Sequence, residues 1–224
     1  MKSTTLNLVR LAAAFAAVSC VIATSSAATI STFDSSADGW TAVGDTAAPV
    51  TFIATGGNPG GFVQVEDSVS GGVIYFVAPS KFLGNHSAAY GTNFQFDLMQ
   101  FFTEAPDQFD DDDILLTGAG LTLAFDTATN PLNGAWSSYS VPLVETGWHL
   151  TNIAGPPPTQ AQMQSVLGNL TSVEIRGEFQ TGPDTDSLDN VQLVPEPSSA
   201  ILLLCGALFV LRRRLPCAPK ACGA

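Results

Sequence analysis

Carboxylates are the residues of this sequence that offer the most chemistry. The four adjacent aspartates from Asp110 to Asp113 form its densest polar cluster, and Asp184, Asp186 and Asp189 follow one another at short spacing. Successive side chains of an extended chain point to opposite sides, so the four adjacent aspartates cannot all face one ion. We expect them to form a solvated loop. The later three lack the central glycine and final glutamate of an EF-hand, and we do not expect one there.

Catalytic chemistry is weakly indicated. His86 and His149 are the only histidines, no Gly-x-Ser-x-Gly elbow occurs, and Ser87 beside His86 has no visible third member of a triad. Glycoside hydrolysis needs two carboxylates about 5 to 10 Å apart, and the acidic residues are numerous enough to supply such a pair. We therefore expect a protein that is not an enzyme. A secreted carbohydrate-active enzyme of the glycosidase kind is the alternative.

Aromatic rings are the candidate sugar-binding groups, because a flat ring presents an apolar face to a pyranose. Most aromatic side chains of a β-sandwich belong to its core, and we expect this of Trp40. Trp136 ends the turn-like segment 133–136, so it is the ring that we expect to be exposed. Trp136 is the candidate ligand-binding residue, and a purely structural role is the alternative.

Charge is unevenly distributed along the 224 residues, which carry a formal net charge of −12. All acidic residues except Glu196 lie between residues 29 and 194, where Lys81 and Arg176 are the only basic residues. Such a segment repels nucleic acid and anionic lipid, so no nucleic-acid partner is expected. It also favours divalent cations such as Ca²⁺, although acidic charge can serve solubility alone. All four cysteines lie outside this segment, which leaves no thiol or disulfide in it.

Residues 29–194 have the hydrophobic pattern of β-strands, with apolar and polar residues alternating or with β-branched and aromatic runs between turn residues. The predicted strands cover residues 50–55, 62–66, 73–78, 94–99, 121–126, 173–179 and 188–194. Thr159 and Gln162 form a capping box that predicts one helix over 159–170, with its apolar face closing an open end of the sheets. We predict an all-β fold, a β-sandwich or jelly roll with one short helix, in a single domain.

The two ends of the chain have the composition of targeting segments. Lys2 and Arg10 precede an apolar stretch, and small residues follow it. This layout predicts a signal peptide with an N-terminal helix over residues 1–28. The C-terminal features are, in order, Pro195, Glu196 and Pro197, the apolar run 200–211, and Arg212, Arg213 and Arg214. Positive charge after an apolar helix favours the cytoplasmic side. The run is shorter than the about 20 residues that normally cross the hydrocarbon, so it fits a temporary transmembrane anchor.

This order of motifs over residues 195–215 resembles the PEP-CTERM sorting signal of Gram-negative bacteria. The resemblance implies that exosortase, a membrane-embedded enzyme, recognises the Pro-Glu-Pro motif and removes the tail, with the three arginines as the stop-transfer cluster. It also implies an inner-membrane intermediate, followed by the cell surface or extracellular matrix. The extension over 216–224, expected to be cytoplasmic, departs from the usual pattern. A tail-anchored protein whose prolines form only a linker is the alternative.

Several blocks within residues 29–194 carry a second resemblance. They are FD at 33–34, DGW at 38–40, GGFV at 60–63, FVAP at 76–79, FLGN at 82–85, VEIRGE at 173–178 and LDNV at 188–191. Together they are similar to a laminin B (laminin IV) domain covering roughly residues 32–193. The resemblance implies a β-sandwich like that of many carbohydrate-binding modules, which acts as a binding or structural module without catalytic activity. The expected partner is extracellular polysaccharide or a neighbouring protein.

A structural Ca²⁺ ion is expected where the two ends of the sandwich meet. If the first and last strands pair, Asp34 lies near Asp189, and the two carboxylates can share one cation with loop carbonyls. Similar sandwich modules hold a structural calcium at this junction, and the resemblance carries that role to Asp189 and to Asp34. The alternative is that Asp189 bonds its own backbone in an Asx turn.

Overall fold

The computed structural model describes residues 28–44, 46, 49–67 and 72–195. The predicted signal helix and all of the predicted transmembrane segment except Pro195 lie outside these residues. Among the helices within the described ranges, none is long and apolar enough to cross a membrane.

Six antiparallel strands form a first sheet, called sheet A, in the order β3-β4-β12-β6-β9, with β1 also paired to β12. Its strands are β1 (Thr29–Ser31), β3 (Thr51–Gly57), β4 (Gly60–Asp67), β6 (Asn93–Phe101), β9 (Ser137–Pro142) and β12 (Asp184–Leu193). Sheet B has the order β10-β8-β7-β11-β5-β2. Its strands are β2 (Thr41–Val43), β5 (Tyr75–Val77), β7 (Ile114–Gly118), β8 (Leu121–Phe125), β10 (Trp148–Leu150) and β11 (Leu170–Arg176).

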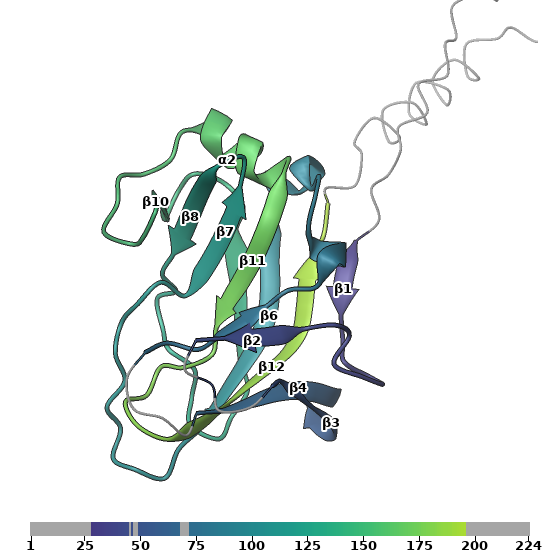
Figure 1. Ribbon diagram of the computed structural model, residues 1–224, viewed down its shortest axis with the longest axis vertical. Coiled ribbons are helices and arrows are strands. Elements are labelled where there is room, and N and C mark those ends of the chain that lie inside the picture. The colour runs from purple at the N-terminus through teal and green to yellow at the C-terminus, as the bar shows by residue number, and fades with distance from the viewer. Residues whose placement is uncertain (1–27, 45, 47–48, 68–71, 196–224) are drawn as a thin grey trace, which may run out of the picture. The chain divides into compact units, whose positions relative to one another are not determined.

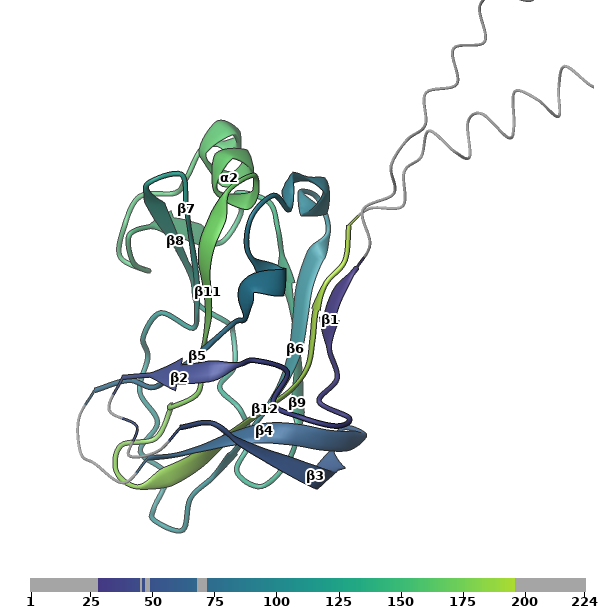
Figure 2. The same ribbon diagram turned by 45° about the vertical axis from the view of Figure 1, so that its right-hand side comes forward.

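The two sheets pack face to face as a β-sandwich. In Figure 1, β7, β8 and β11 of sheet B lie in front of β6 and β12 of sheet A, and Figure 2 turns these two layers toward an edge-on view. Alternate residues of each strand point inward, as the period of two requires. Val63 and Leu188 of sheet A and Phe76 and Ile175 of sheet B are fully buried in one shared core. Burying each such side chain stabilises the fold by about 1.5 to 3 kcal/mol. The two sheets confirm the predicted all-β sandwich.

One α-helix, α2 (Gln160–Leu167), covers the end of sheet B near β7 and β8 (Figure 1). The predicted capping box is present, because Thr159 accepts from the backbone N–H of Gln162, whose side chain accepts from the Thr159 N–H. The predicted helix end at residue 170 is wrong. The chain turns after Leu167, and Leu170 is already the first residue of β11. Two short 3₁₀ helices, η1 (Ser80–Phe82) and η2 (Ser87–Ala89), connect β5 to β6.

Strand β12 joins the beginning and the end of the described chain. It pairs with β4 over residues 184–188 and with β1 over residues 191–193, while β6 runs along its other edge. The register shifts between Asp189 and Gln192, and Asn190 has a positive φ of 51°. Asparagine tolerates this left-handed conformation better than most residues. Beyond Asn190, β1 takes the place of β4 beside β12, so the first described strand pairs with the last, which is the condition for bringing Asp34 near Asp189.

Candidate functional site

The loop between β3 and β4 folds over the outer face of sheet A. Leu188 points into the core, so the next residue, Asp189, faces outward, and the backbone N–H of Asn58 donates to its Oδ2 at 2.6 Å. Gly57 is required for this approach. A Cβ at that position would lie 2.4 Å from the carbonyl oxygen of Gly61 and 2.7 Å from Asp189 Oδ2. The sequence GGNPGG thus lets the backbone contact a buried carboxylate.

Two asparagines and two aspartates form a polar network beneath this loop. Asp97 lies opposite Asp189 in the β6–β12 register. Its Oδ2 accepts from Asn58 Nδ2 at 3.2 Å and from Asn190 Nδ2 at 2.8 Å, and Asn190 also donates to the carbonyl oxygen of Asn58. The residues of this network other than Asp189 were not predicted as site residues. The LDNV and GGNPGG blocks were the signal that could have found Asn190 and Asn58.

Asp34, in the segment that follows β1, borders the same network. It follows Phe33, and a Cβ at Gly60 would lie 3.1 Å from its Oδ1, so this carboxylate faces the β3–β4 loop. Thr32 Oγ1 donates to its Oδ2 at 2.7 Å. The side chain is exposed and lines a depression of about 210 Å³ formed by residues 30–38. The structure therefore brings Asp34 and Asp189 to one loop.

The electrostatics of this junction favour a proton or a cation. Burial raises the pKa of Asp189 to about 6, against the lowering effect of the Asn58 and Asn190 backbone N–H groups, and the charges of Asp97 and Asp34 raise it further. Asn190 N donates to Asp189 Oδ1 at 2.7 Å, so the local backbone bond expected of an Asx residue is also present. Within the described ranges, no three acidic, histidine or cysteine side chains are arranged to hold a metal ion as they stand.

Trp136 lies at the edge of the same outer face and is half-buried. Its Nε1–H donates to the carbonyl oxygen of Gly56 at 3.0 Å. Its ring meets that of Phe62 edge to face, with centroids 5.5 Å apart and an interplanar angle of 81°. Trp40, in contrast, is buried in the core, where its indole N–H donates to Ser31 Oγ. We call Trp136, Phe62, Asn58, Asn190 and Asp97 the outer platform.

The interpretation of residues 110–113 as a solvated loop is wrong for its last member. Asp113 is buried and accepts from Arg176 Nη1 at 3.1 Å and from the Thr127 backbone N–H at 2.9 Å. Arg176 is fully buried between the rings of Phe109 and Phe179, 4.5 and 4.3 Å from their centroids. This pair ties the acidic loop to β11. Only Asp110 of the run is fully exposed.

The remaining candidate residues are placed as follows. His86 Nε2 and His149 Nδ1 lie within hydrogen-bond distance of the carbonyl oxygens of Leu83 and Gly155, at 3.2 and 2.7 Å. Pro195 is buried just beyond the end of β12. The other residues of the sorting motif and the arginine cluster, Glu196, Pro197, Arg212, Arg213 and Arg214, lie outside the described residues.

Fold and site together define an all-β sandwich module with a structured polar platform on one sheet. The laminin B (domain IV) family model matches residues 75–196, more than half of the chain, so the protein belongs to the laminin B family. It is 30% identical over 184 residues to laminin subunit gamma-1 of Xenopus tropicalis, covering 76% of this chain and 10% of that protein. The chain thus spans about a tenth of that relative.

Two solved structures have a similar fold at low sequence identity. The L4b domain of human laminin alpha-2 superposes with a TM-score of 0.50 at 13% identity, covering 59% of this chain and 79% of that chain. A family 11 carbohydrate-binding module from Clostridium thermocellum, solved with a β-1,3-1,4-linked tetrasaccharide, gives a TM-score of 0.49 at 13% identity, covering 76% and 98%. Both are similarities of fold.

Proposed function

We propose that this protein is exported and sorted by an exosortase, and that its sandwich then acts outside the cell as a non-catalytic structural module that binds polysaccharide at the outer platform. Membership of the laminin B family supports a structural role. The observation that carries the glycan-binding part is the geometry of Trp136.

The platform combines the two kinds of group that sugars require. The Trp136 indole is fixed by the Gly56 carbonyl and by Phe62, so little side-chain entropy is lost when a pyranose packs on its exposed surface. The amides of Asn58 and Asn190 supply donors and acceptors for hydroxyl groups, and the buried carboxylate of Asp97 holds both amides in place. The outer face of a sheet can accept a long polymer, which binds weakly at any one sugar and more strongly through repeats.

A structural Ca²⁺ ion at the β1–β12 junction is part of this proposal. Asp34 and Asp189 would supply carboxylate oxygens, and the carbonyl oxygens of the β3–β4 loop are the kind of additional ligand that Ca²⁺ accepts. The ion would supply positive charge where burial and neighbouring aspartates otherwise favour a proton on Asp189. Its expected effect is to hold the loop, and so the platform, in place.

A glycan array tests the binding function. The full chain, wild type and Trp136→Ala, is applied to plant and bacterial polysaccharides with and without Ca²⁺, and Lys81→Met serves as a control because Lys81 contacts Asp38 and the Ile30 carbonyl away from the platform. We expect binding by the wild type and the control and at least a tenfold loss in Trp136→Ala. Absence of binding to every sugar would leave only the structural role.

Sorting is tested separately in the producing cell. Glu196→Ala should block tail removal and leave the protein in the inner membrane if an exosortase reads residues 195–197. Unchanged export and unchanged mass of the mature protein would contradict the sorting proposal and leave the binding proposal intact.

A further inference from the structure

A second acidic cluster lies between the two sheets, away from the outer platform. Asp184 of β12 is paired with Asp67 of β4, and Asp186 lies two residues further along β12 on the same inward face as Leu188. The three side chains are 5%, 1% and 1% exposed, respectively. Carboxylates are rarely buried to this degree without a partner of opposite charge.

The groups that act on Asp184 and Asp186 are a neutral amide and other carboxylates. Gln100 of β6 donates through Nε2 to Asp184 Oδ2 and lies 3.5 Å from Asp186 Oδ1. Glu178, also buried, accepts from the Ile74 backbone N–H at 3.1 Å, and its negative charge acts on Asp186. Of the two basic residues of the exported segment, Lys81 pairs with Asp38, and Arg176 pairs with Asp113 and donates to the Glu178 carbonyl oxygen. No ion pair to Asp184 or Asp186 is therefore found within the described residues.

Two oxygens of the cluster receive no donor from any neighbouring group in the described part of the chain. They are Asp184 Oδ1 and Asp186 Oδ2. The two carboxyl groups approach each other and can hydrogen-bond only when one of them carries a proton, and burial raises the pKa of both. Leaving a buried charged oxygen without a partner costs several kcal/mol. A proton or a bound cation must offset that cost.

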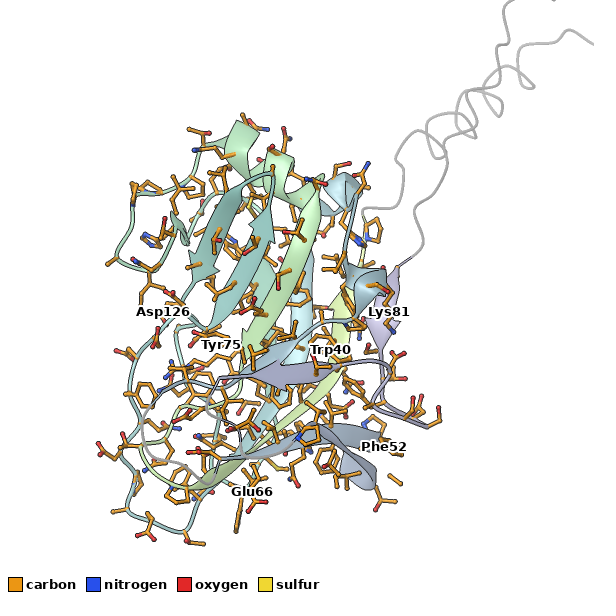
Figure 3. The ribbon with its side chains drawn as sticks, viewed as in Figure 1. Trp40, Phe52, Glu66, Tyr75, Lys81 and Asp126 are labelled. Atoms are coloured by element: carbon orange, nitrogen blue, oxygen red, sulfur yellow. The ribbon has the colours of Figure 1, made fainter. Side chains whose placement is uncertain are left out.

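A small pocket gives access to the cluster from solvent. It measures about 180 Å³ and is lined by Glu66, Asp67 and Asp184 together with Phe101, Phe102 and Thr103 at the end of β6. Glu66 is labelled in Figure 3 and marks this end of β4. Pockets for organic ligands usually measure about 300 to 1,000 Å³, so this one is too small to enclose a sugar. It is large enough for a hydrated ion.

We propose that Asp67, Asp184 and Asp186 hold one Ca²⁺ ion between the sheets, with Glu178 as a neighbouring carboxylate. Asp67 and Asp184 lie opposite each other on antiparallel strands, where Cβ atoms are about 4.5 to 5.5 Å apart, so both carboxylates can reach one ion whose oxygen ligands lie about 2.3 to 2.6 Å from it. The carboxyl groups of Asp184 and Asp186, which approach each other in this structure, would turn toward the metal. Oxygen ligands without histidine or cysteine favour Ca²⁺ over zinc or copper.

The ion would add an electrostatic link between carboxylates of the two sheets. Asp67 and Asp184 fix the ends of β4 and β12 in sheet A, while Glu178 follows β11 of sheet B. Asp186 also contacts Gly177, where an added Cβ would lie 3.1 Å from the Asp186 Cβ. The site therefore cross-links the two sheets at the end opposite α2, independently of the calcium proposed at Asp34 and Asp189.

Calorimetric titration of the EDTA-treated full chain with CaCl₂ tests this site. The variants are Asp186→Asn, which keeps the shape and removes a buried charge, Asp189→Asn for the other junction, and Asp110→Asn as an exposed control. We expect Asp186→Asn to bind one ion fewer than the wild type, and Asp110→Asn to bind as many.

The outcomes separate this site from the calcium of the proposed function. An ion that Asp189→Asn keeps and Asp186→Asn loses supports the inference. Equal numbers of ions in Asp186→Asn and the wild type overturn it, as does a single ion that only Asp189→Asn loses, which would leave the junction site standing. If the wild type binds no Ca²⁺, both calcium sites are wrong, whereas sugar binding is measured separately on the array.

Discussion

Removing the charge of Arg176 should destabilise the protein strongly. In Arg176→Met the carboxylate of Asp113 stays buried but loses its cation, and the carbonyl oxygens of Phe109 and Glu178 lose the guanidinium donors that reach them at 2.9 and 2.6 Å. Removing one partner of a buried ion pair lowers the free energy of unfolding by about 3 to 5 kcal/mol. In a domain of this size 1 kcal/mol corresponds to about 2 to 4 °C, so the melting temperature should fall by about 6 to 20 °C.

Lys81→Met provides a matched control because it removes the other basic charge of the exported segment. The Lys81–Asp38 pair is exposed, with side-chain exposures of 36% and 39%, and such pairs contribute about 0 to 1 kcal/mol. Circular dichroism melts of both variants give the comparison. Adding Asp113→Asn to Arg176→Met should recover part of the loss, since no buried charge is left unpaired. Similar small losses in Arg176→Met and Lys81→Met would refute the assignment of a buried, stabilising ion pair.

Three further predictions concern the junction, the loop and the helix. In EDTA, the free energy of unfolding should fall as pH rises from about 4 to 6, because the raised pKa values of Asp189 and Asp184 make the folded state bind more protons than the unfolded state. Asp189→Asn should make this fall less steep in urea titrations, and an unchanged slope would contradict the role of Asp189. Gly57→Ala should cost about 1 to 3 kcal/mol by the same assay, since its Cβ would meet Gly61 O at 2.4 Å, and a neutral effect would mean that the loop is not held against Asp189. Thr159→Ala should cost about 1 kcal/mol by removing the cap of α2, and Thr159→Ser should restore most of it; equal stability of the two variants would exclude the cap.

The period of two predicted the strands whose faces differ most in polarity. Residues 94–99 and 121–126 correspond to β6 and β8, and the helix start at Thr159 followed from local capping chemistry. Strand β7 was not predicted, because its apolar residues directly follow the acidic run 110–113. Strands β1, β2 and β10 have three residues each, too few for a periodic signal.

Site residues that depend on distant pairing were harder to predict. The approach of Asp34 to Asp189 followed from pairing of the first and last strands, which the β1–β12 register shows. The partnership of Arg176 with Asp113 could not be predicted, since β11 and the acidic loop meet only through the register of sheet B. The same holds for Asp67, which faces Asp184 across strands far apart in sequence. The charge pattern indicated acidic sites but not which carboxylates meet.

Chemical-shift mapping tests the central claim, that the outer platform of sheet A binds polysaccharide, most directly. The ¹⁵N-labelled full chain is titrated with the soluble polysaccharide that gives the strongest array signal. We predict shifts of the Trp136 indole N–H and of the backbone N–H groups of Asn58 and Asn190, with those of β7 and β8 unchanged. Shifts confined to sheet B, or binding that leaves the Trp136 indole signal in place, would contradict the account.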